Sequence, residues 1–512
     1  MTQPQRVSGP GILLVLDGWG EAAPGPANAL SAAGTPVLDS LRAGHPSGLL
    51  AASGEAVGLL PGTVGNSEIG HMVIGAGRPL PYDSLLVQQE IDGGGLRRNA
   101  LLTGAGDVIA STGRALHLIG LCSDGQIHAD IEHLSELLAV AAEAGVPRVW
   151  IHAITDGRDV ADGTAESYLR RAQHLAERAG VGRIATVTGR GYALDKAGNL
   201  DVTREAVLAV ADGTGPGVKS PEEAVRSSER GDEWVPPSVV LGPDGDALAP
   251  IRDGDAVLFF NFRSDRIQQF ADALLVHLAE TGRTVTALSL AQYDTTAPIP
   301  PLVPRADASG GLADELAAAG LRSVRIAEAE KFEHVTYYVN GRSDVRREVE
   351  EHVRIKGEKA PDYRARPEME LGLVTAAVVT AAHRPEVDLV VANLANIDVV
   401  GHTGDFDATV GAAEATDAAV QEILISASQS GRWVILVGDH GNVELMSKPG
   451  PDGTDRPYGG HTTNPVPVVV VPAPGNPDGE LRDDGTLADI APTVLALLGR
   501  DAGAAMTGRP LL

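Results

Sequence analysis

Carboxylates and imidazoles occur in this chain at spacings that suit a divalent metal ion. Asp398 and His402 are four residues apart, so on one helical turn both side chains would lie on the same face. Asp439 and His440 are adjacent, and both can reach one site if the chain turns there. Mixed carboxylate and imidazole donors favour ions such as Mn or Zn over Ca. The other candidate ligands of these two types are Asp17 and His461.

Ser67 is the candidate nucleophile, in the glycine-flanked sequence Gly65-Asn-Ser-Glu-Ile-Gly-His71. A serine hydroxyl is a weak nucleophile at neutral pH, and binding to a divalent metal favours its alkoxide. The chain has no Gly-x-Ser-x-Gly elbow, so a hydrolase-type Ser-His-Asp triad is the weaker explanation. The simplest alternative is that Ser67 only caps a helix that begins at Glu68.

A second set of motifs carries arginine and one histidine. The planar guanidinium fork binds carboxylate or phosphate in two-pronged fashion. The chain has 41 Lys and Arg against 68 Asp and Glu, a net charge of −27, so arginines gathered in one place indicate an anion pocket. For any single arginine, a surface ion pair is the alternative. The motifs are Ser123–His128, Asp156-Gly-Arg-Asp159, Thr188-Gly-Arg190 and Asn261-Phe-Arg-Ser-Asp-Arg266.

Both sets of residues follow short apolar runs that are typical of parallel strands buried on both faces. Stretches with helical spacing lie between these runs, as at 133–144 and 161–179, which predicts an α/β fold. Ligands of open α/β sheets bind beyond the carboxyl ends of the strands, where the polar residues stand. The predicted strands are 11–17, 148–156, 183–190, 256–263, 388–393 and 434–439.

The 512 residues are too many for one ordinary core. Acidic and histidine-bearing strand ends lie near both termini, and arginine-bearing ends lie between them. Two proline-rich passages, 78–81 and 298–304, separate the groups. We therefore predict a discontinuous domain, 1–82 and 301–512, with a second domain inserted at 83–300.

Composition excludes several classes of function. A charge of −27 repels nucleic acid and anionic lipid, so we expect neither as a partner. No apolar run is long enough for a membrane span or a secretory signal. The single Cys122 excludes an intramolecular disulfide framework. We expect a cytoplasmic protein.

Six motifs together resemble those of the cofactor-independent phosphoglycerate mutases of the alkaline phosphatase superfamily. They run in the family's order over most of the chain. The resemblance implies an alkaline-phosphatase-like doubly wound α/β domain with a second α/β domain inserted, and an isomerase that interconverts 3- and 2-phosphoglycerate as a monomer. The motifs are Leu16–Gly20, Gly65–Met72, Asp156–Val160, Asn396–His402, Asp439–Asn442 and Gly460–Pro465.

The same resemblance implies a set of site residues. Two Mn ions, or Mg or other divalent ions, would be held by Asp17, Ser67, Asp439 and His440 and by Asp398, His402 and His461. Phosphate would pass through a phosphoserine at Ser67, and Asp159 would move the hydroxyl proton. The residues implied to bind the three-carbon acid are His128, Arg158, Asp159, Arg190, Lys196, Arg263, Arg266 and Lys331.

The sequence departs from the family pattern around the implied pocket. Lys196 stands in place of an arginine, and Gly191 in place of an aromatic residue, which predicts free space beside the anion site. Gln126 replaces a glycine beside His128, and the chain reads Val339-Asn-Gly-Arg-Ser-Asp344 where the family commonly has Phe-Ser-Gly-Gly. A mutase of the same mechanism for a related phosphorylated or phosphono acid is therefore the alternative function. A metal-dependent phosphatase and a non-catalytic binding role fit the motifs less well.

Overall fold

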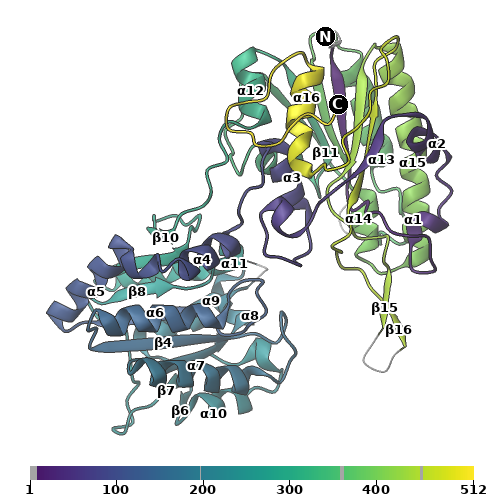
Figure 1. Cartoon of the computed structure of the whole chain (residues 1–512). Helices are drawn as coiled ribbons and strands as arrows, with labels where there is room; N and C mark the ends of the chain where they lie inside the picture. The colour runs from purple at the N-terminus through teal and green to yellow at the C-terminus, as the bar shows by residue number, and fades with distance from the viewer. Residues whose placement is uncertain (1–8, 196–197, 358–361, 450–453) are drawn as a thin grey trace. The chain divides into compact units, whose positions relative to one another are not determined.

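The computed structural model describes residues 9–195, 198–357, 362–449 and 454–512 (Figure 1). The chain divides into two compact units, Met1–Pro81 with Asp307–Leu512 and Tyr82–Ala306. The second unit therefore begins at Tyr82 and ends at Ala306, where the sequence predicted 83 and 300. The later end has a structural cause, because the short strand β10 (Pro301–Val303) pairs with a strand of the second unit. The predicted position of Lys196 lies outside the described residues.

A seven-stranded sheet forms the centre of the first unit. Its first five strands are parallel, and β17 and β2 complete it through antiparallel pairing. Strand β1, near the start of the chain, lies between β13 and β14, which come from the last third of the chain. In sheet order the strands are β12 (Glu350–Ile355), β11 (Ser323–Glu328), β13 (Leu389–Leu394), β1 (Gly11–Leu16), β14 (Trp433–Gly438), β17 (Val466–Val471) and β2 (Ser47–Leu50).

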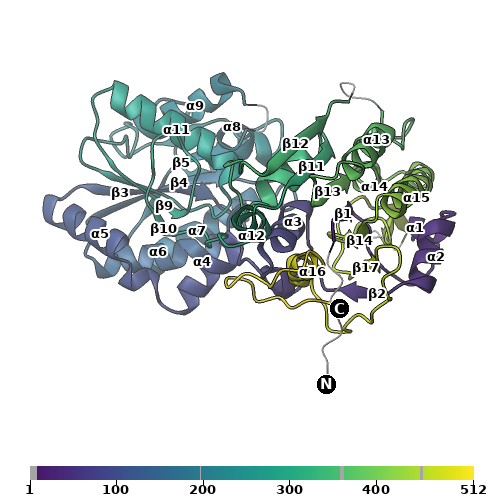
Figure 2. The ribbon, with the colours of Figure 1, turned by 90° about the horizontal axis from the view of Figure 1, so that it is seen from above.

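Helices cover both faces of this sheet (Figure 2). One layer contains α1 (Ala29–Ala32), α2 (Pro36–Gly44), α13 (Leu371–Ala382), α14 (Asn396–Gly401) and α15 (Phe406–Gln429). The other contains α3 (Ser67–Ala76), α12 (Leu312–Ala319) and α16 (Ile490–Leu497). The central strands read as unbroken apolar runs because both of their faces are buried. The unit also has the short helices η1 (Gly54–Val57), η4 (His334–Tyr338) and η5 (Leu487–Asp489), and the hairpin β15 (Ser447–Pro449) and β16 (Asp455–Pro457).

The second unit is built around an eight-stranded sheet of its own. In sheet order its strands are β10, β9 (Thr286–Ala291), β8 (Ala256–Phe259), β3 (Ala115–Leu121), β4 (Arg148–Thr155), β5 (Arg183–Gly189), β7 (Ser238–Val240) and β6 (Gly217–Val218). Its helices are α4 (Asp83–Asp92), η2 (Leu96–Arg98), α5 (Ala100–Thr112), α6 (Ile131–Glu143), α7 (Ala165–Ala179), α8 (Arg190–Ala193), α9 (Leu200–Asp212), α10 (Pro221–Arg226), η3 (Asp232–Trp234) and α11 (Ser264–Glu280).

Two hydrophobic cores flank this second sheet, one beneath α6 and α7 and the other beneath α9 and α11. The two helix layers are visible in Figure 2. The predicted α/β class is confirmed in both units, and each predicted strand corresponds to an observed one. In the part of the chain that the structure describes, every helix is too short or too polar to span a bilayer.

Candidate metal centre and anion pocket

The acidic residues of the first unit meet at the carboxyl ends of adjacent strands. Asp17 follows β1 and Asp439 follows β14, which pairs with β1 in parallel, so the register brings both carboxylates to one edge. Asp398 joins them from α14, which begins directly after β13. Asp17 and Asp439 are fully buried, and Asp398 is 1% exposed. The predicted convergence of these three residues is thus present in the structure.

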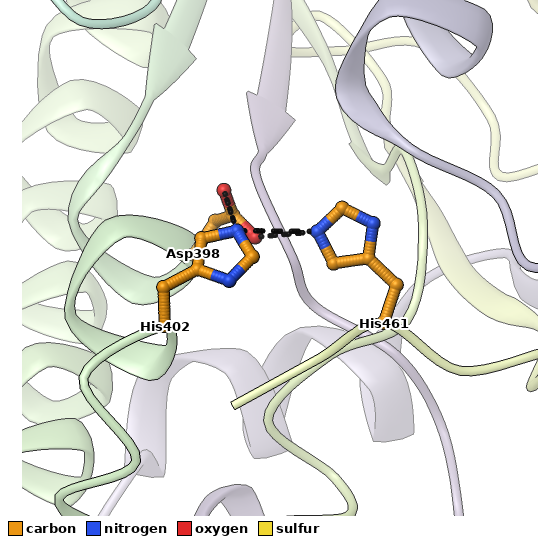
Figure 3. A group of neighbouring side chains, drawn as sticks. All are labelled: Asp398, His402 and His461. Atoms are coloured by element: carbon orange, nitrogen blue, oxygen red, sulfur yellow. Dashed lines mark hydrogen bonds and ion pairs between the residues drawn. The ribbon is translucent and has the colours of Figure 1, made fainter. Parts of the chain in front are cut away.

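His402 and His461 both turn a ring nitrogen towards the Asp398 carboxylate (Figure 3). His402 lies one helical turn after Asp398, with its Nε2 3.4 Å from Asp398 Oδ2. His461 comes from the loop before β17, with its Nε2 3.4 Å from Asp398 Oδ1. The two Nε2 atoms are 3.3 Å apart. One carboxylate and two imidazoles therefore present their ligand atoms to a common point, as a metal site of this donor type requires.

Backbone carbonyls fix the orientation of all three predicted histidine ligands. Nδ1 of His402 lies 2.7 Å from the Gly459 carbonyl oxygen, and Nδ1 of His461 lies 2.9 Å from that of Gly65. His440 Nδ1 lies 3.3 Å from the carbonyl oxygen of its neighbour Gly441. A carbonyl oxygen only accepts, so each Nδ1 carries a hydrogen, and Nε2 is the nitrogen that would bind a metal ion. Imidazoles held in this way are prepared to bind a metal.

Ser67 occupies the first position of α3, and its hydroxyl points at the acidic residues. The N-cap of this helix is Asn66, whose side chain accepts from the Ile69 amide, so Ser67 does not serve as the cap. Ser67 Oγ donates to Asp17 Oδ1 at 3.1 Å and lies 3.0 Å from His440 Nε2. The start of the helix also favours negative charge on this oxygen.

The ammonium group of Lys331 lies among these same atoms. Its Nζ donates to Asp17 Oδ1 at 2.8 Å, to Asp398 Oδ2 at 2.7 Å and to Ser67 Oγ at 2.6 Å. Although burial lowers the pKa of Lys331, these carboxylates outweigh it and raise the pKa above its usual range. Lys331 therefore belongs to the acidic centre of the first unit, next to the candidate nucleophile.

The charge balance of this centre fits bound cations. Three buried carboxylates, Asp17, Asp398 and Asp439, face one lysine. Asp439 Oδ2 is buried and accepts no hydrogen bond, since the nearby His71 Nδ1 donates to the Ser67 carbonyl. Burial lowers the pKa of His440, but the three carboxylates outweigh it and raise the pKa to about 9. Uncompensated buried charge is costly, so the residues present suit divalent ions.

The structure groups the predicted ligands somewhat differently from the sequence. Asp398, His402 and His461 form one group, as expected. His440 lies with Asp17 and Asp398, whereas Asp439 lies with Asp17 and His71. His71 was not predicted, although it lies one turn after Ser67 on α3.

His71 positions its neighbours. Its Nδ1 donates to the Ser67 carbonyl at 2.8 Å, and its Nε2 accepts from Asn393 at 3.1 Å. Asn393 also donates to Asp17 Oδ2 at 2.6 Å, and Asn442 donates to Asp398 Oδ1 at 2.8 Å. These side chains hold the carboxylates in place, which the motif spacings did not reveal.

The arginine motifs of the second unit meet around a cavity of about 390 Å³. The predicted residues that line it come from the ends of β4 and β5 and from the segments flanking the start of α6 and α11. They are His128, Arg158, Asp159, Arg190, Arg263 and Arg266. Glu233 and Trp234, from η3, complete the wall but were not predicted.

Arg190 is the most buried guanidinium of this pocket, at 6% exposure. Its Nη1 lies 2.6 Å from Asp156 Oδ1 and 2.8 Å from Asp159 Oδ2. Asp156 also accepts from the backbone amides of Arg158 and Asp159, so the loop is tied to its own carboxylate. Burial raises the pKa of Asp159 although Arg190 acts in the opposite direction.

The other cations of the pocket are more open to solvent. Arg263 Nε lies 2.8 Å and Arg266 Nε 3.3 Å from the carboxylate of Asp265. Burial lowers the pKa of His128 to about 3, with Arg263 as the next contribution, so this imidazole is neutral at physiological pH. The Arg158 guanidinium lies 3.4 Å from the Glu233 carboxylate. The pocket thus combines cations with a neutral imidazole, an arrangement suited to a small anionic acid.

One prediction about this pocket is wrong. The space expected beside Gly191 is filled by Trp234, because a Cβ atom at Gly191 would lie only 2.7 Å from Trp234 Cε3. The sequence predicted that the loss of the family's aromatic residue at Gly191 would leave space, but Trp234, which is distant in sequence, occupies it.

Comparison with known proteins agrees with this geometry. Residues 9–502 match the Metalloenzyme superfamily. The chain is 68% identical over all of both sequences to a 2,3-bisphosphoglycerate-independent phosphoglycerate mutase of Streptomyces coelicolor. It is 40% identical to the protein of that name from Moorella thermoacetica, over 99% of each chain. A crystal structure of Leishmania mexicana phosphoglycerate mutase at low cobalt concentration superposes with a TM-score of 0.77 and 28% identity, covering 99% of this chain and 98% of that one.

Proposed function

This chain belongs to the 2,3-bisphosphoglycerate-independent phosphoglycerate mutases, and we propose that it interconverts 3- and 2-phosphoglycerate through a phosphoserine at Ser67. It is an isomerase, since the product contains the same atoms as the substrate. The observation that carries the phosphoserine proposal is the position of Ser67 Oγ, within 3.1 Å of Asp17 Oδ1, His440 Nε2 and Lys331 Nζ.

Ser67 has what a phosphate acceptor needs. Its hydroxyl already donates to the Asp17 carboxylate, which can accept the proton, while the Lys331 ammonium stabilises negative charge on the oxygen. The Ser67 oxygen then bonds to phosphorus as the bond from phosphorus to the C3 oxygen breaks, and that oxygen takes up a proton. Free glycerate and phosphoserine result. The reverse step on the C2 hydroxyl gives 2-phosphoglycerate.

The pocket of the second unit supplies the other requirement of a mutase, which is to keep the glycerate. Arg158, Arg190, Arg263 and Arg266 would bind its carboxylate and hydroxyl oxygens. Asp159 is our candidate for moving the hydroxyl proton, because burial raises its pKa towards the range useful for a proton carrier. A phosphatase would not need such a pocket, so the mutase reaction is favoured.

The metal ions have a defined role in this proposal. We propose that two of them, Mn by preference, are held by Asp17, Ser67, Asp439 and His440 and by Asp398, His402 and His461. When bound, such ions withdraw charge from phosphate oxygens and favour the alkoxide form of serine. The carboxylate and imidazole donors support Mn over Ca.

We also propose that the enzyme is a cytoplasmic monomer. The only cysteine, Cys122, is buried, and the described units need no disulfide. Light scattering of the purified protein tests the oligomeric state.

The proposal is tested by Ser67→Ala, with Ser53→Ala as the control. Ser53 lies in the same unit, but its hydroxyl donates to the Thr463 carbonyl. We expect Ser67→Ala to lose activity on the order of ten-thousand-fold, and Ser53→Ala to keep it. Enzyme quenched during turnover should carry phosphate on Ser67, without added 2,3-bisphosphoglycerate. Phosphate found only on a histidine would overturn the mechanism.

A further inference from the structure

The sequence Gly189-Arg190-Gly191 brings a distant turn against the anion pocket. Gly189 ends β5, and Gly191 lies in α8, so both have ordinary backbone conformations that do not themselves call for glycine. Their lack of a side chain leaves space for the segment that contains Glu233 and Trp234. A Cβ atom at Gly189 would lie 2.4 Å from the Glu233 carbonyl oxygen, and one at Gly191 would lie 2.7 Å from Trp234 Cε3.

The turn that fills this space is held firmly. The Asp232 carboxylate accepts from the Thr164 and Ala165 amides at 2.8 and 2.9 Å. The Thr155 hydroxyl donates to the Asp232 carbonyl at 2.7 Å, and the Gly189 amide donates to the Val235 carbonyl. The residues on both sides of Trp234 are therefore anchored to β4, β5 and the start of α7.

Two further side chains contact the indole of Trp234. Its ring makes an edge contact with Tyr192, with centroids 5.7 Å apart. The Arg230 guanidinium lies 4.1 Å from the ring centroid, within the range of a cation–π interaction. Trp234 thus forms a fixed apolar wall in a cavity otherwise lined mainly by charged groups.

We propose that Trp234 is a positioning and size-selecting residue of this pocket, and that Gly191 is present to admit it. The proposal rests on the proposed function and names the feature that sets the length of the bound acid. Carbon atoms of a three-carbon acid would pack against the indole, which leaves its oxygens towards Arg190 and Arg263. A longer carbon chain would meet the ring.

A double-mutant cycle tests the pairing of Gly191 with Trp234. Gly191→Ala should lower kcat/KM for 3-phosphoglycerate at least ten-fold, because the new methyl group displaces the indole. Trp234→Ala alone should also lower it, and the double variant should be no worse than Trp234→Ala alone, because the methyl group then has room and both changes act on one contact. Gly104→Ala is the matched control, because nothing lies within 4 Å of a Cβ atom there. Wild-type activity in Gly191→Ala, or losses that multiply in the double variant, would overturn the pairing.

Binding without turnover separates this inference from the proposed function. Dissociation constants of D-glycerate and the four-carbon D-erythronate are measured by calorimetry on chelator-treated full-length protein. Trp234→Ala should reduce the preference for glycerate at least ten-fold, whereas Trp150→Phe, outside the pocket, should leave it unchanged. A purely structural role of Trp234 would weaken both acids alike and overturn size selection. Trp234→Phe, with thermal unfolding as the check on folding, should give an intermediate preference. A protein without mutase activity would refute the proposed function, while the ratio of the two constants would still decide the role of Trp234.

Discussion

The candidate sites of the two units differ in burial and in charge balance. In the first unit, Asp17, Asp439 and His440 are fully buried, and their orientation is fixed by backbone and side-chain hydrogen bonds. In the second, the side chains of Arg158 and Arg263 are 57% and 31% exposed, and each already has a carboxylate partner of its own chain. The first centre therefore demands cations to balance its charge. The second can exchange an internal carboxylate for that of a ligand.

This difference predicts how substitutions in each unit will affect activity. A donor set built around buried carboxylates and fixed by hydrogen bonds loses function when one ligand is removed. A pocket of arginines paired with carboxylates depends on the geometry of each guanidinium, so a change that keeps the charge should still weaken it, although less than the loss of a metal ligand weakens the first site. The following experiments test this contrast, beginning with the largest expected effect.

Removal of one predicted metal ligand should affect activity far more than stability. His402→Ala should lower activity by roughly 1,000-fold or more. Mutation of residues that only hydrogen-bond to metal ligands already costs about 10–100-fold. Bound metal, measured by mass spectrometry, should fall from two ions to about one. The control is His45→Ala, a surface histidine paired with Asp478. Full activity in a preparation shown to be free of metal would contradict the metal assignment.

Arg190→Lys tests the second pocket. Arg190 uses one nitrogen, Nη1, for both Asp156 and Asp159, which leaves its other N–H groups for a ligand. Lysine keeps the charge but lacks these further donors in a planar fork. Loss of one charge-assisted hydrogen bond, about 1.5–3 kcal/mol, would lower kcat/KM about ten- to a hundred-fold. Arg226→Lys changes a surface arginine paired with Glu166 and should have little effect. Equal kinetics of the two variants would show that Arg190 acts only as a charge.

Acid should weaken the second unit through its buried neutral histidines. His117 Nδ1 lies 2.9 Å from His152 Nε2, and burial lowers the pKa of both. His128 behaves alike, with a pKa of about 3 against 6.5 for a free imidazole.

At these three histidines the unfolded chain therefore binds more protons than the folded one below about pH 6.5. The contribution of these neutral histidines to stability is fully present above this pH and is lost as the pH falls towards 3. Thermal unfolding between pH 7.5 and 5 should show this slope, which His152→Gln should reduce and His174→Gln, at an exposed position, should not. A melting temperature independent of pH over this range would contradict the prediction.

The smallest expected effect concerns backbone strain beside the pocket. Gln126 has a φ of +55°, in the left-handed region that favours glycine, and its side chain donates to Asp130 at 2.8 Å. Relief of strain should exceed the loss of this bond, so Gln126→Gly should stabilise the protein by up to about 1 kcal/mol. Gln173→Gly, within helix α7, should destabilise it by about 1 kcal/mol. Chemical denaturation compares the two, and destabilisation of equal size in both would show that Gln126 is unstrained.

Sequence alone predicted much of the site because its chemistry lies in short motifs. The four-residue spacing of Asp398 and His402 survives in the fold as one helical turn. Strand ends were predictable because buried parallel strands leave unbroken apolar runs, as at 388–393. Asp17 and Asp439 could then be placed at one edge, although their pairing register could not be predicted.

Contacts between segments that are distant in sequence could not be predicted. No spacing indicates that Lys331 would lie between Asp17 and Asp398, or that Trp234 would fill the space beside Gly191. The sequence does not indicate that β10 belongs to the second sheet, because the strand has only three residues, begins with proline, and joins the sheet through pairing with β9.

The position of β1 has a consequence for the order of events during synthesis. This strand pairs only with β13 and β14, so it has no partner until residues 389–438 have left the ribosome. The segment Tyr82–Ala306 is complete much earlier and contains all the strands of its own sheet. We expect it to fold first, while the N-terminal segment that contains Ser67 is still without its partner strands. A truncated chain therefore cannot form the Ser67 site. The nascent protein cannot remove phosphate from an ester before the second unit, which would hold the acceptor, has folded.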